Sequence, residues 1–451
     1  MKGTVLIEKV ISFLKDFSYQ DIPDAAKDNS ITSFLDLIGV AASATQTDLS
    51  KIIRQHCSSY YLHNPNISKP SSIWFDGRLV NSIGATLANA MTIDALDAHD
   101  GQKLTKGHVG CGVIPSLIAF MQSEGNLDPK TFLSNLIIGY EIGTRAGISL
   151  HRTTDDYHTS GAWISLACAG IGSNILNLSY SQTREAFGIA EYHGPRSQMM
   201  RCIDHPSMVK DGSGWGAMAG VNAAYLAKNG FTGSPAITIE NGELSDIWSD
   251  LGSRWYINEQ YLKLYPVCRW AQPAVEATLN LKKEYDIKLG EIDSITINSF
   301  HEAKRLEGKH PATTEEAQYS LPHPVAVGLI FGKIGAKEVS EELINNEEVS
   351  SLREKINVTE SEEYNSYFPE KRFANAIIKL GNGKILKSGP TEAKGDPENP
   401  LNDLEVKKKF EDLTFSVLGM ERSKKIYEII TNYHSLESME EVFSLITEPT
   451  N

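Results

Sequence analysis

One polar segment between two apolar stretches constrains the fold more than any other part of the chain. Residues 93–115 read IDALDAHDGQKLTKGHVGCGVIP and contain three acids, two histidines and two lysines. The flanking apolar sequence predicts two helices, the first ending near Asp97 and the second with Pro115 in its first turn. Charged groups that lie between two buried helices commonly line a pocket. We therefore expect this segment to form part of an active site.

The length and composition predict a soluble globular protein with two domains. The chain has 451 residues, of which 41% are hydrophobic and 22% charged, whereas single cores stop growing at roughly 250–300 residues. No apolar run approaches the ~18 residues that span a bilayer, and charge interrupts residues 1–8 too early for a secretory signal. We expect a cytoplasmic protein without a membrane partner.

The net charge and the cysteines exclude several kinds of partner. A formal net charge of −14 argues against binding to nucleic acid or to an anionic membrane. The five cysteines are widely spaced and form no CxxC pair, which indicates reduced, buried thiols and neither a disulfide framework nor a zinc site. An anionic substrate would need a locally basic pocket in a chain this acidic.

The sequence pattern changes near Tyr265. Over residues 31–227, short polar joints separate apolar stretches rich in Ala, Gly and Leu, which is typical of closely packed helices. After Tyr265, residues 293–300 alternate at period two, and residues 374–386 predict a hairpin around an Asn-Gly turn. Further helical patterns lie at 275–283, 324–332 and 401–447.

These patterns predict a mainly α fold. We expect a large helical domain over residues 1–264 and an inserted smaller α+β lid domain over residues 265–399. Residues 400–451 are expected to return to the helical domain, because they again form charged amphipathic helix.

Three local signals predict details of the helical domain. Glu141 and Arg145 have the spacing of an i,i+4 ion pair on a helix. Ser181 is expected to cap a helix over residues 182–190. Asn229-Gly230 is expected to end a helix over residues 217–228.

Five further blocks follow the polar segment in a consistent order: Tyr157–Trp163, Met208–Gly220, Lys263–Pro273, Ala317–Pro322 and Ala393–Pro400. Together with the polar segment they resemble the MmgE/PrpD family, which includes 2-methylcitrate dehydratase, cis-aconitate decarboxylase and iminodisuccinate epimerase. The chain departs from the family pattern at His99, where a second acid is common, and at Val109, where proline is usual. It also carries Gln272 where several members have histidine.

The resemblance implies a helical domain with an inserted α+β domain, a pocket at their junction, a homodimer built on the helical domain, and no cofactor. It also implies which residues line the pocket and are candidate catalytic groups: Asp97, His108, His158, Lys210 and Tyr319.

Each candidate also has an ordinary structural interpretation. His108 could be an exposed residue of a glycine turn, and His158 could cap the helix that follows it. Lys210 could form a local ion pair with Asp211, and Tyr319 could belong to the core. In the functional interpretation His158 suits a base near neutral pH, and Lys210 is a carboxylate anchor or a proton donor.

Other polar residues in the same blocks are candidates for binding a di- or tricarboxylate substrate: Asp100, Gln102, Lys103, Arg201, Arg269 and Gln272, with Arg196 and His205 as further candidates for anion binding. Gln272 can form hydrogen bonds but cannot exchange a titrating proton. Asp97, His99, Asp100 and His108 could instead form a metal cluster, but their spacing matches no tetrahedral zinc pattern, so we expect no metal.

The sequence lacks the motifs of several other enzyme classes. The glycines at 212–216 match neither the Walker pattern nor GxGxxG, and no Gly-X-Ser-X-Gly elbow occurs. Removal of a proton next to a carboxylate needs a base, an acid and fixed cations. We therefore expect a cofactor-free acid–base enzyme, foremost a 2-methylcitrate dehydratase-type hydro-lyase. An epimerase of an amino- or imino-dicarboxylate is the alternative, followed by a cis-aconitate decarboxylase.

Overall fold

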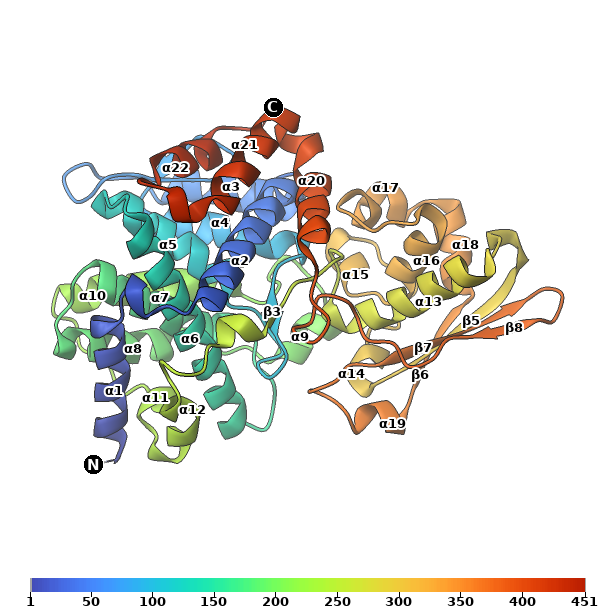
Figure 1. The fold of residues 1–451 in the computed structure, drawn as a ribbon, viewed down its shortest axis with the longest axis horizontal. Helices are drawn as coiled ribbons and strands as arrows, with labels where there is room; N and C mark the ends of the chain where they lie inside the picture. The colour runs from blue at the N-terminus through green and yellow to red at the C-terminus, as the bar shows by residue number, and fades with distance from the viewer. Residues whose placement is uncertain (1, 451) are drawn as a thin grey trace.

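The computed structural model describes residues 2–450, and most of them form helices that pack into one large body (Figure 1). Its helices are α1 Lys2–Asp16, α2 Asp24–Ala44, α3 Asp48–Tyr60, α4 Ser82–Leu96, α5 Gly110–Glu124, α6 Pro129–Thr153, α7 Gly161–Ile175, α8 Tyr180–His193, α9 Met199–Asp204, α10 Ser213–Lys228, α11 Ile237–Glu240 and α12 Ser245–Ser249. Two short strand pairs accompany them: β1 Ser71–Ser72 with β2 Leu79–Val80, and β3 Gly101–Gln102 with β4 Gln260–Tyr261.

Small residues allow the central helices of this body to approach closely. Helix α7 packs against α5, α6, α8 and α10. A Cβ atom added at Gly216 of α10 would lie 2.2 Å from the carbonyl oxygen of Gly161 in α7, so only glycine permits this contact. The many Ala and Gly residues of this part of the chain therefore allow the short distances between the helices around the candidate site.

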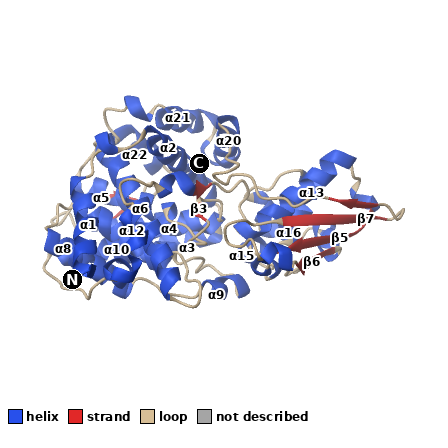
Figure 2. Cartoon of the chain, turned by 60° about the horizontal axis from the view of Figure 1, so that its bottom comes forward, coloured by secondary structure: helices blue, strands red, loops and turns tan. Residues whose placement is uncertain are grey.

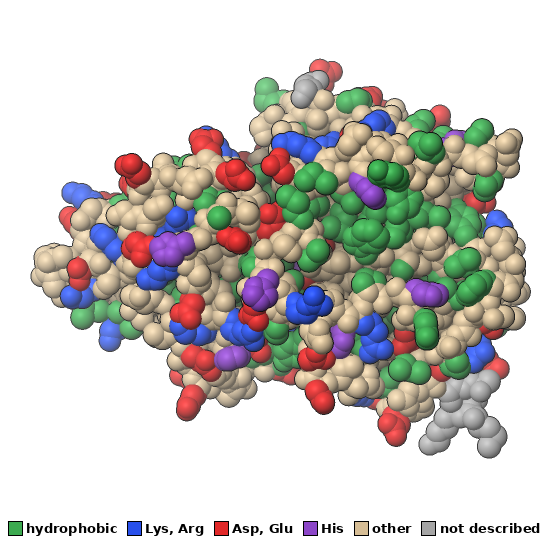
Figure 3. Space-filling model, turned by 180° about the vertical axis from the view of Figure 1, so that it is seen from behind, with side chains coloured by type: hydrophobic (Ala, Val, Ile, Leu, Met, Phe, Trp, Pro, Cys, Tyr) green, Lys and Arg blue, Asp and Glu red, His purple; other side chains and the backbone are tan. Residues whose placement is uncertain are grey.

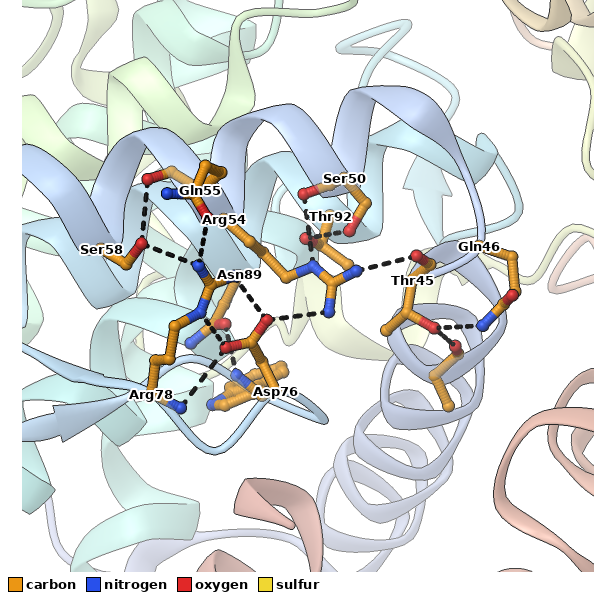
Figure 4. Close-up of polar contacts among 12 residues, drawn as sticks. Thr45, Gln46, Ser50, Arg54, Gln55, Ser58, Asp76, Arg78, Asn89 and Thr92 are labelled. Atoms are coloured by element: carbon orange, nitrogen blue, oxygen red, sulfur yellow. Dashed lines mark hydrogen bonds and ion pairs between the residues drawn. The ribbon is translucent and has the colours of Figure 1, made fainter. Parts of the chain in front are cut away.

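Helix α3 is joined to the β1–β2 hairpin by a partly buried ionic network (Figure 4). Arg54 lies 3.1 Å from the Asp76 carboxylate and donates a 2.9 Å hydrogen bond to the carbonyl oxygen of Thr45, at the end of α2. Arg78 pairs with the same carboxylate and donates to Ser58 of α3 at 2.8 Å. The network connects three elements.

The second body contains the main sheet and stands beside the helical body (Figure 2). Its elements are α13 Gln272–Tyr285, β5 Ile292–Ser299, α14 His301–Lys304, α15 Thr314–Gln318, α16 Pro322–Phe331, α17 Glu341–Ile344, α18 Glu347–Glu354, β6 Ile356–Glu360, α19 Glu362–Asn365, β7 Ala374–Leu380 and β8 Ile385–Lys387. The strand order is β6-β5-β7-β8, with β5 and β6 parallel and the other pairs antiparallel. Helix α13 packs against β7 and α16.

The last helices lie on the first body although they are distant in sequence from its core. Helices α20 Asp403–Leu418, α21 Met420–Thr431 and α22 Glu440–Thr447 follow the sheet, and α20 packs along α2 (Figure 1). The structure is thus mainly α with a smaller α+β part, as the sequence predicted. None of the helices within residues 2–450 combines the length and hydrophobicity needed to cross a membrane.

Several local predictions are confirmed. Strand β5 and the β7–β8 hairpin form where the period-two pattern and the Asn-Gly turn placed them. Helix α10 ends at the Asn229 cap, and Arg145 lies 3.5 Å from Glu141 as an i,i+4 pair. The five cysteines are buried and free.

Two predicted helix starts are wrong. Helix α5 begins at Gly110, which places Pro115 inside the helix and beyond its first turn. Gly110 and Gly112 pack against Tyr140 and Ile164, so tertiary contacts start the helix before the proline. Helix α8 is capped by Ser179 and not by Ser181, because the Ser179 hydroxyl and the Gln182 amide form a reciprocal capping box.

Candidate active site

A small cavity lies where the two bodies meet. Its volume is about 20 Å³, room for about one water molecule. The lining residues come from the polar segment, from α9, from the turn before α10, from the chain that leads into the second body, and from the end of α15: Asp97, Lys106, His108, Met199, Ile203, Asp211, Tyr261, Lys263, Cys268, Arg269, Trp270 and Tyr319. In this closed arrangement the cavity brings together four of the predicted site residues, namely Asp97, His108, Arg269 and Tyr319.

Asp97 and Lys263 form a buried ion pair at one wall of the cavity. Asp97 follows α4 with a left-handed backbone, φ 56°, which turns the chain out of the helix. The Lys263 ammonium lies 2.6 Å from the Asp97 carboxylate and 3.0 Å from its carbonyl oxygen. Burial alone would raise the pKa of Asp97, but the charges of Lys263 and Lys210 and the hydrogen bond from Lys263 together outweigh it and hold that pKa below its ordinary value. Asp97 is therefore ionised.

His108 is held in a defined orientation. Its backbone N–H donates to the Ser160 hydroxyl at 2.9 Å, and its Nδ1 contacts the carbonyl oxygen of Asp100. Because a carbonyl can only accept, Nδ1 carries the proton and Nε2 of the neutral ring has a free lone pair. Burial and the charge of Lys263 lower the pKa of His108 to about 4, so the ring is neutral at pH 7. His108 can therefore accept a proton at Nε2.

Tyr319 lines the same cavity as His108, and Lys210 lies next to the Tyr319 ring although it is not among the lining residues. Lys210 is buried and has a left-handed backbone, φ 48°. Its ammonium donates to the Gln318 side chain at 2.5 Å and lies 4.7 Å from the centre of the Tyr319 ring. Burial raises the pKa of Tyr319 well above its ordinary value, so its phenol stays protonated. Both groups can donate a proton or hold an anion.

Two further carboxylates lie near these groups, Asp211 in the lining of the cavity and Asp94 outside it. Asp211 accepts a 2.7 Å hydrogen bond from the Ser160 hydroxyl, and its carboxylate is 3.8 Å from Nε2 of His108. Burial and the negative charge of Asp211 raise the pKa of Asp94 to about 7. Asp94 and His99 lie 3.7 Å apart. The site thus contains buried acids with different protonation behaviour.

His158 lies outside the residues that line the closed cavity. Its Nδ1 is 3.3 Å from the carbonyl oxygen of Asp156, and its backbone N–H donates to the His151 ring at 3.0 Å. It does not cap α7, because Ser160 occupies that position. A β-bridge joins His158 to Gln198, immediately before α9, whose Met199 lines the cavity. His158 therefore does not line the cavity, but its bridge to Gln198 connects it to the neighbouring Met199, which does.

Three predicted binding residues of the polar segment make contacts within the protein. The Asp100 carboxylate accepts from the Tyr140 hydroxyl, and burial raises its pKa to about 7. The Gln102 side chain caps its own turn by accepting from the Leu104 N–H at 2.5 Å. Lys103 pairs with Glu398 at 2.9 Å. None of these three side chains lines the cavity.

The remaining predicted binding residues divide into buried and exposed groups. Arg269 lines the cavity and lies 2.8 Å from Asp396. Gln272 is buried behind it, accepts from Arg269 at 3.1 Å and donates to the carbonyl oxygen of Val267. Arg201 is exposed on α9 and bonds weakly to Ser197, and Arg196 and His205 are exposed as well.

Three charged residues that line the cavity were not predicted from the sequence: Lys106, Asp211 and Lys263. Each stands in a block that had been singled out, Lys106 in the polar segment and Lys263 at the start of the block over 263–273. The missing signal was burial, since a lysine in a sequence gives no sign that it will be buried beside an aspartate.

One cluster in the site has the residue types of a metal centre. Ligand atoms of Asp97, His99 and His108 lie within 4.8 Å of one another. The Lys263 ammonium already occupies the Asp97 carboxylate, and the positive charges of Lys263 and Lys210 act on His99. A divalent cation would meet two fixed ammonium groups there. The donor set therefore does not suit a metal ion, and we assign none.

Comparison with known proteins identifies relatives of two activities. The chain is 23% identical over 416 residues to a cis-aconitate decarboxylase-like protein of Aspergillus oryzae, covering 80% of this chain and 82% of that protein. It is 22% identical over 459 residues to the cis-aconitate decarboxylase of Homo sapiens, covering 95% and 92%. It is also 29% identical over 249 residues to a mitochondrial 2-methylcitrate dehydratase of Yarrowia lipolytica, covering 49% and 47%.

Family models account for nearly the whole chain. The MmgE/PrpD N-terminal domain matches residues 8–249, and the MmgE/PrpD C-terminal domain matches residues 265–435. The second match extends past the sheet and includes α20 and α21, although α20 packs on α2 of the helical body. The chain therefore belongs to the MmgE/PrpD family.

Proposed function

We propose that this protein is an acid–base lyase that acts on a di- or tricarboxylate, and specifically a hydro-lyase of the 2-methylcitrate dehydratase type. The observation that carries the proposal is that neutral His108, protonated Tyr319 and the Asp97 and Lys263 ion pair line one cavity, with the Lys210 ammonium beside the Tyr319 ring. A base, an acid and fixed cations in one buried cavity are the parts that an elimination next to a carboxylate requires.

The proposed reaction begins at His108. Its Nε2 takes the proton from the carbon next to a substrate carboxylate, and the C–H electron pair becomes the second bond of a carbon–carbon double bond. The bond to the hydroxyl on the neighbouring carbon breaks at the same time. Lys210 or Tyr319 protonates the departing hydroxide, which leaves as water, and Lys263 and Arg269 hold carboxylates.

Asp97 and His158 have different parts in this proposal. Asp97 keeps Lys263 charged and fixed, since the aspartate raises the pKa of that lysine against the effect of burial. His158 stays a candidate base or donor that borders the cavity through its bridge to Gln198. The cavity has room for about one water molecule, so a substrate requires the two bodies to separate.

A decarboxylase is the second candidate. The similarity to the human cis-aconitate decarboxylase extends over 95% of this chain, whereas the dehydratase of Yarrowia lipolytica matches 49% of it. In this reaction a carbon–carboxylate bond breaks, carbon dioxide leaves, and the electron pair is protonated at carbon. Lys210 or Tyr319 could supply that proton.

Proton NMR in D₂O separates the reactions. The enzyme is incubated with 2-methylcitrate, citrate, cis-aconitate and iminodisuccinate. His108→Gln serves as the inactive control, and His301→Gln, at an exposed histidine, serves as the matched control. New olefinic signals from a hydroxy-tricarboxylate support the hydro-lyase. Release of carbon dioxide supports the decarboxylase, and deuterium entry with scrambled stereochemistry supports an epimerase. A folded protein that leaves all four acids unchanged contradicts the proposal.

We also propose that the protein forms a homodimer through its helical body. Hydrophobic side chains gather on the face of this body that Figure 3 shows. Exposed large apolar residues in and next to α10 include Met208, Val209, Trp215, Leu226 and Phe231. Exposed apolar patches of this kind are typical of association surfaces.

A further inference from the structure

The cations near the cavity differ in whether a carboxylate neutralises them. Lys263 lies 2.6 Å from Asp97, Arg269 lies 2.8 Å from Asp396, and Lys103 lies 3.5 Å from the same Asp396. Within residues 2–450, three other buried or half-buried cations of this region have no carboxylate oxygen within 4.0 Å: Lys106, Lys210 and Arg372. Lys210 belongs to the proposed catalytic group. Lys106 and Arg372 have no assigned part.

Arg372 is a buried guanidinium with unused donors. It is 2% exposed and precedes β7 of the second body. Its Nη2 donates to the carbonyl oxygen of Lys103 at 3.2 Å, whereas its buried Nε and Nη1 have no hydrogen-bond partner among the described residues. Its guanidinium also lies 5.6 Å from the centre of the Tyr261 ring, which lines the cavity. Burial of a cation without a counter-charge is costly, so an anion at this place would stabilise it.

The helical body contributes Lys106, which lies near enough to Arg372 for the two charges to interact. Its side chain lines the cavity, and its backbone N–H donates to the carbonyl oxygen of Lys103 at 3.3 Å, the same oxygen that accepts from Arg372. The Lys106 ammonium has one hydrogen bond, to the carbonyl oxygen of Leu104, and lies over the Tyr157 ring. Burial and the nearby Arg372 charge lower the pKa of Lys106 to about 8.

Two carboxylates in the neighbourhood do not neutralise this pair. Glu302 and Glu370 act on Lys106 through their charges, but neither carboxylate comes within 4.0 Å of Lys106 or Arg372. The two cations therefore repel each other across the junction of the two bodies. An anion between them would remove the repulsion and would connect the bodies.

We propose that Lys106 and Arg372 together bind a substrate carboxylate remote from the reacting carbon, so a third carboxylate contributes to affinity. This inference rests on the proposed function. Lys263, Arg269 and Lys210 serve the carboxylates near the reacting carbon, and the Nε and Nη1 donors of Arg372 are free to bind the remote one. Arg372 moves with the second body, so binding of that carboxylate favours closure.

Binding of unreactive acids tests the pair without turnover. Isothermal titration measures tricarballylate, which has three carboxylates, and glutarate, which has two. Arg372→Met and Lys106→Met should each weaken tricarballylate binding by at least about tenfold and glutarate binding by less than about twofold. Arg372→Lys keeps the charge and should lose less than Arg372→Met. Lys371→Met, which removes an exposed charge one residue away, is the matched control and should leave both affinities unchanged.

The melting temperature distinguishes binding from a structural role. Without ligand, Arg372→Met should melt at or above the wild-type temperature, because it removes an uncompensated buried charge. Tricarballylate should then raise its melting temperature less than that of wild type. The inference would be overturned if the variants lost affinity equally for both acids, if neither variant lost affinity, or if Lys371→Met lost as much. It would also be overturned if the wild type did not bind tricarballylate. Selective binding without turnover in the NMR assay would contradict only the proposed reaction.

Discussion

The Lys263 ammonium lies 2.6 Å from the Asp97 carboxylate, and both side chains are almost wholly buried. The two residues are separated by 166 positions in the sequence. The pair connects the end of α4 to the chain that leads into the second body. Burial of either charge alone would be costly in free energy, and each is stabilised because the other lies beside it.

Removal of one member of this pair should destabilise the protein. Lys263→Met should lower the free energy of unfolding by about 3–5 kcal/mol, because it leaves a buried carboxylate unpaired. The double variant Asp97→Asn with Lys263→Met should recover part of that loss. Urea denaturation measures both, and Lys379→Met, which breaks the exposed pair with Asp293, should cost at most about 1 kcal/mol.

The Asp97 and Lys263 pair should also make the stability of the protein depend on pH. The native pKa of Asp97 lies below its ordinary value, so the contribution of the pair to stability is fully present above the ordinary aspartate pKa. It is lost as the pH falls from there through the native pKa. The wild-type advantage over the double variant should therefore shrink in acid, and an advantage that is constant over this range would argue against the ion pair.

His108 should titrate far below an ordinary histidine. Its pKa is lowered to about 4, so the ring stays neutral between about 4 and the ordinary value near ~6.5. The acid limb of kcat/KM should lie near pH 4, and His108→Gln should lower turnover by about 10²–10⁴-fold. Because the unfolded chain binds a proton that the native ring does not, wild type should lose stability relative to His108→Gln as the pH falls through this range. An acid limb near pH 6.5 would contradict a buried neutral base.

Lys210 and His158 should affect turnover more than stability. Lys210→Ala and His158→Gln should each lower turnover by about 10²–10⁴-fold while the melting temperature stays nearly unchanged. His323→Gln should do the reverse, because His323 is buried, contacts Arg353 and bonds to the carbonyl oxygen of Glu338. Normal turnover in a folded Lys210 or His158 variant would remove that residue from the catalytic group.

Activity should not depend on a metal ion. The cluster of Asp97, His99 and His108 shares its space with the Lys263 ammonium, so prolonged dialysis against a chelator should leave turnover unchanged. Elemental analysis should find no stoichiometric zinc, iron or magnesium. Loss of turnover that one particular metal restores would refute this assignment.

The homodimer is tested by sedimentation. At micromolar concentration the protein should sediment as a species of about twice the 49.7 kDa chain mass. Trp215→Asp, on the exposed side of α10, should shift the population toward the monomer. Ile385→Asp, at an exposed apolar position of the second body, serves as the control. A fully active wild-type monomer would argue against the dimer.

The sequence by itself determined the elements whose pattern is local. The alternation over residues 293–300 produced β5, the Asn-Gly turn produced the β7–β8 hairpin, and the helix before Asp97 ended where it was expected to. These features depend on periodicity and turn chemistry within a few residues. The family blocks also singled out Asp97 and His108, which line the cavity, because those residues stand in recognisable motifs.

Only the tertiary structure decided which of the charged residues meet. It paired Lys263 with Asp97, bonded Arg372 to the carbonyl oxygen of Lys103, and left His158 outside the closed cavity. It also started α5 before Pro115, through the contacts of Gly110. Burial and ion pairing between residues far apart in the chain depend on how the two bodies pack, and no local pattern encodes that packing.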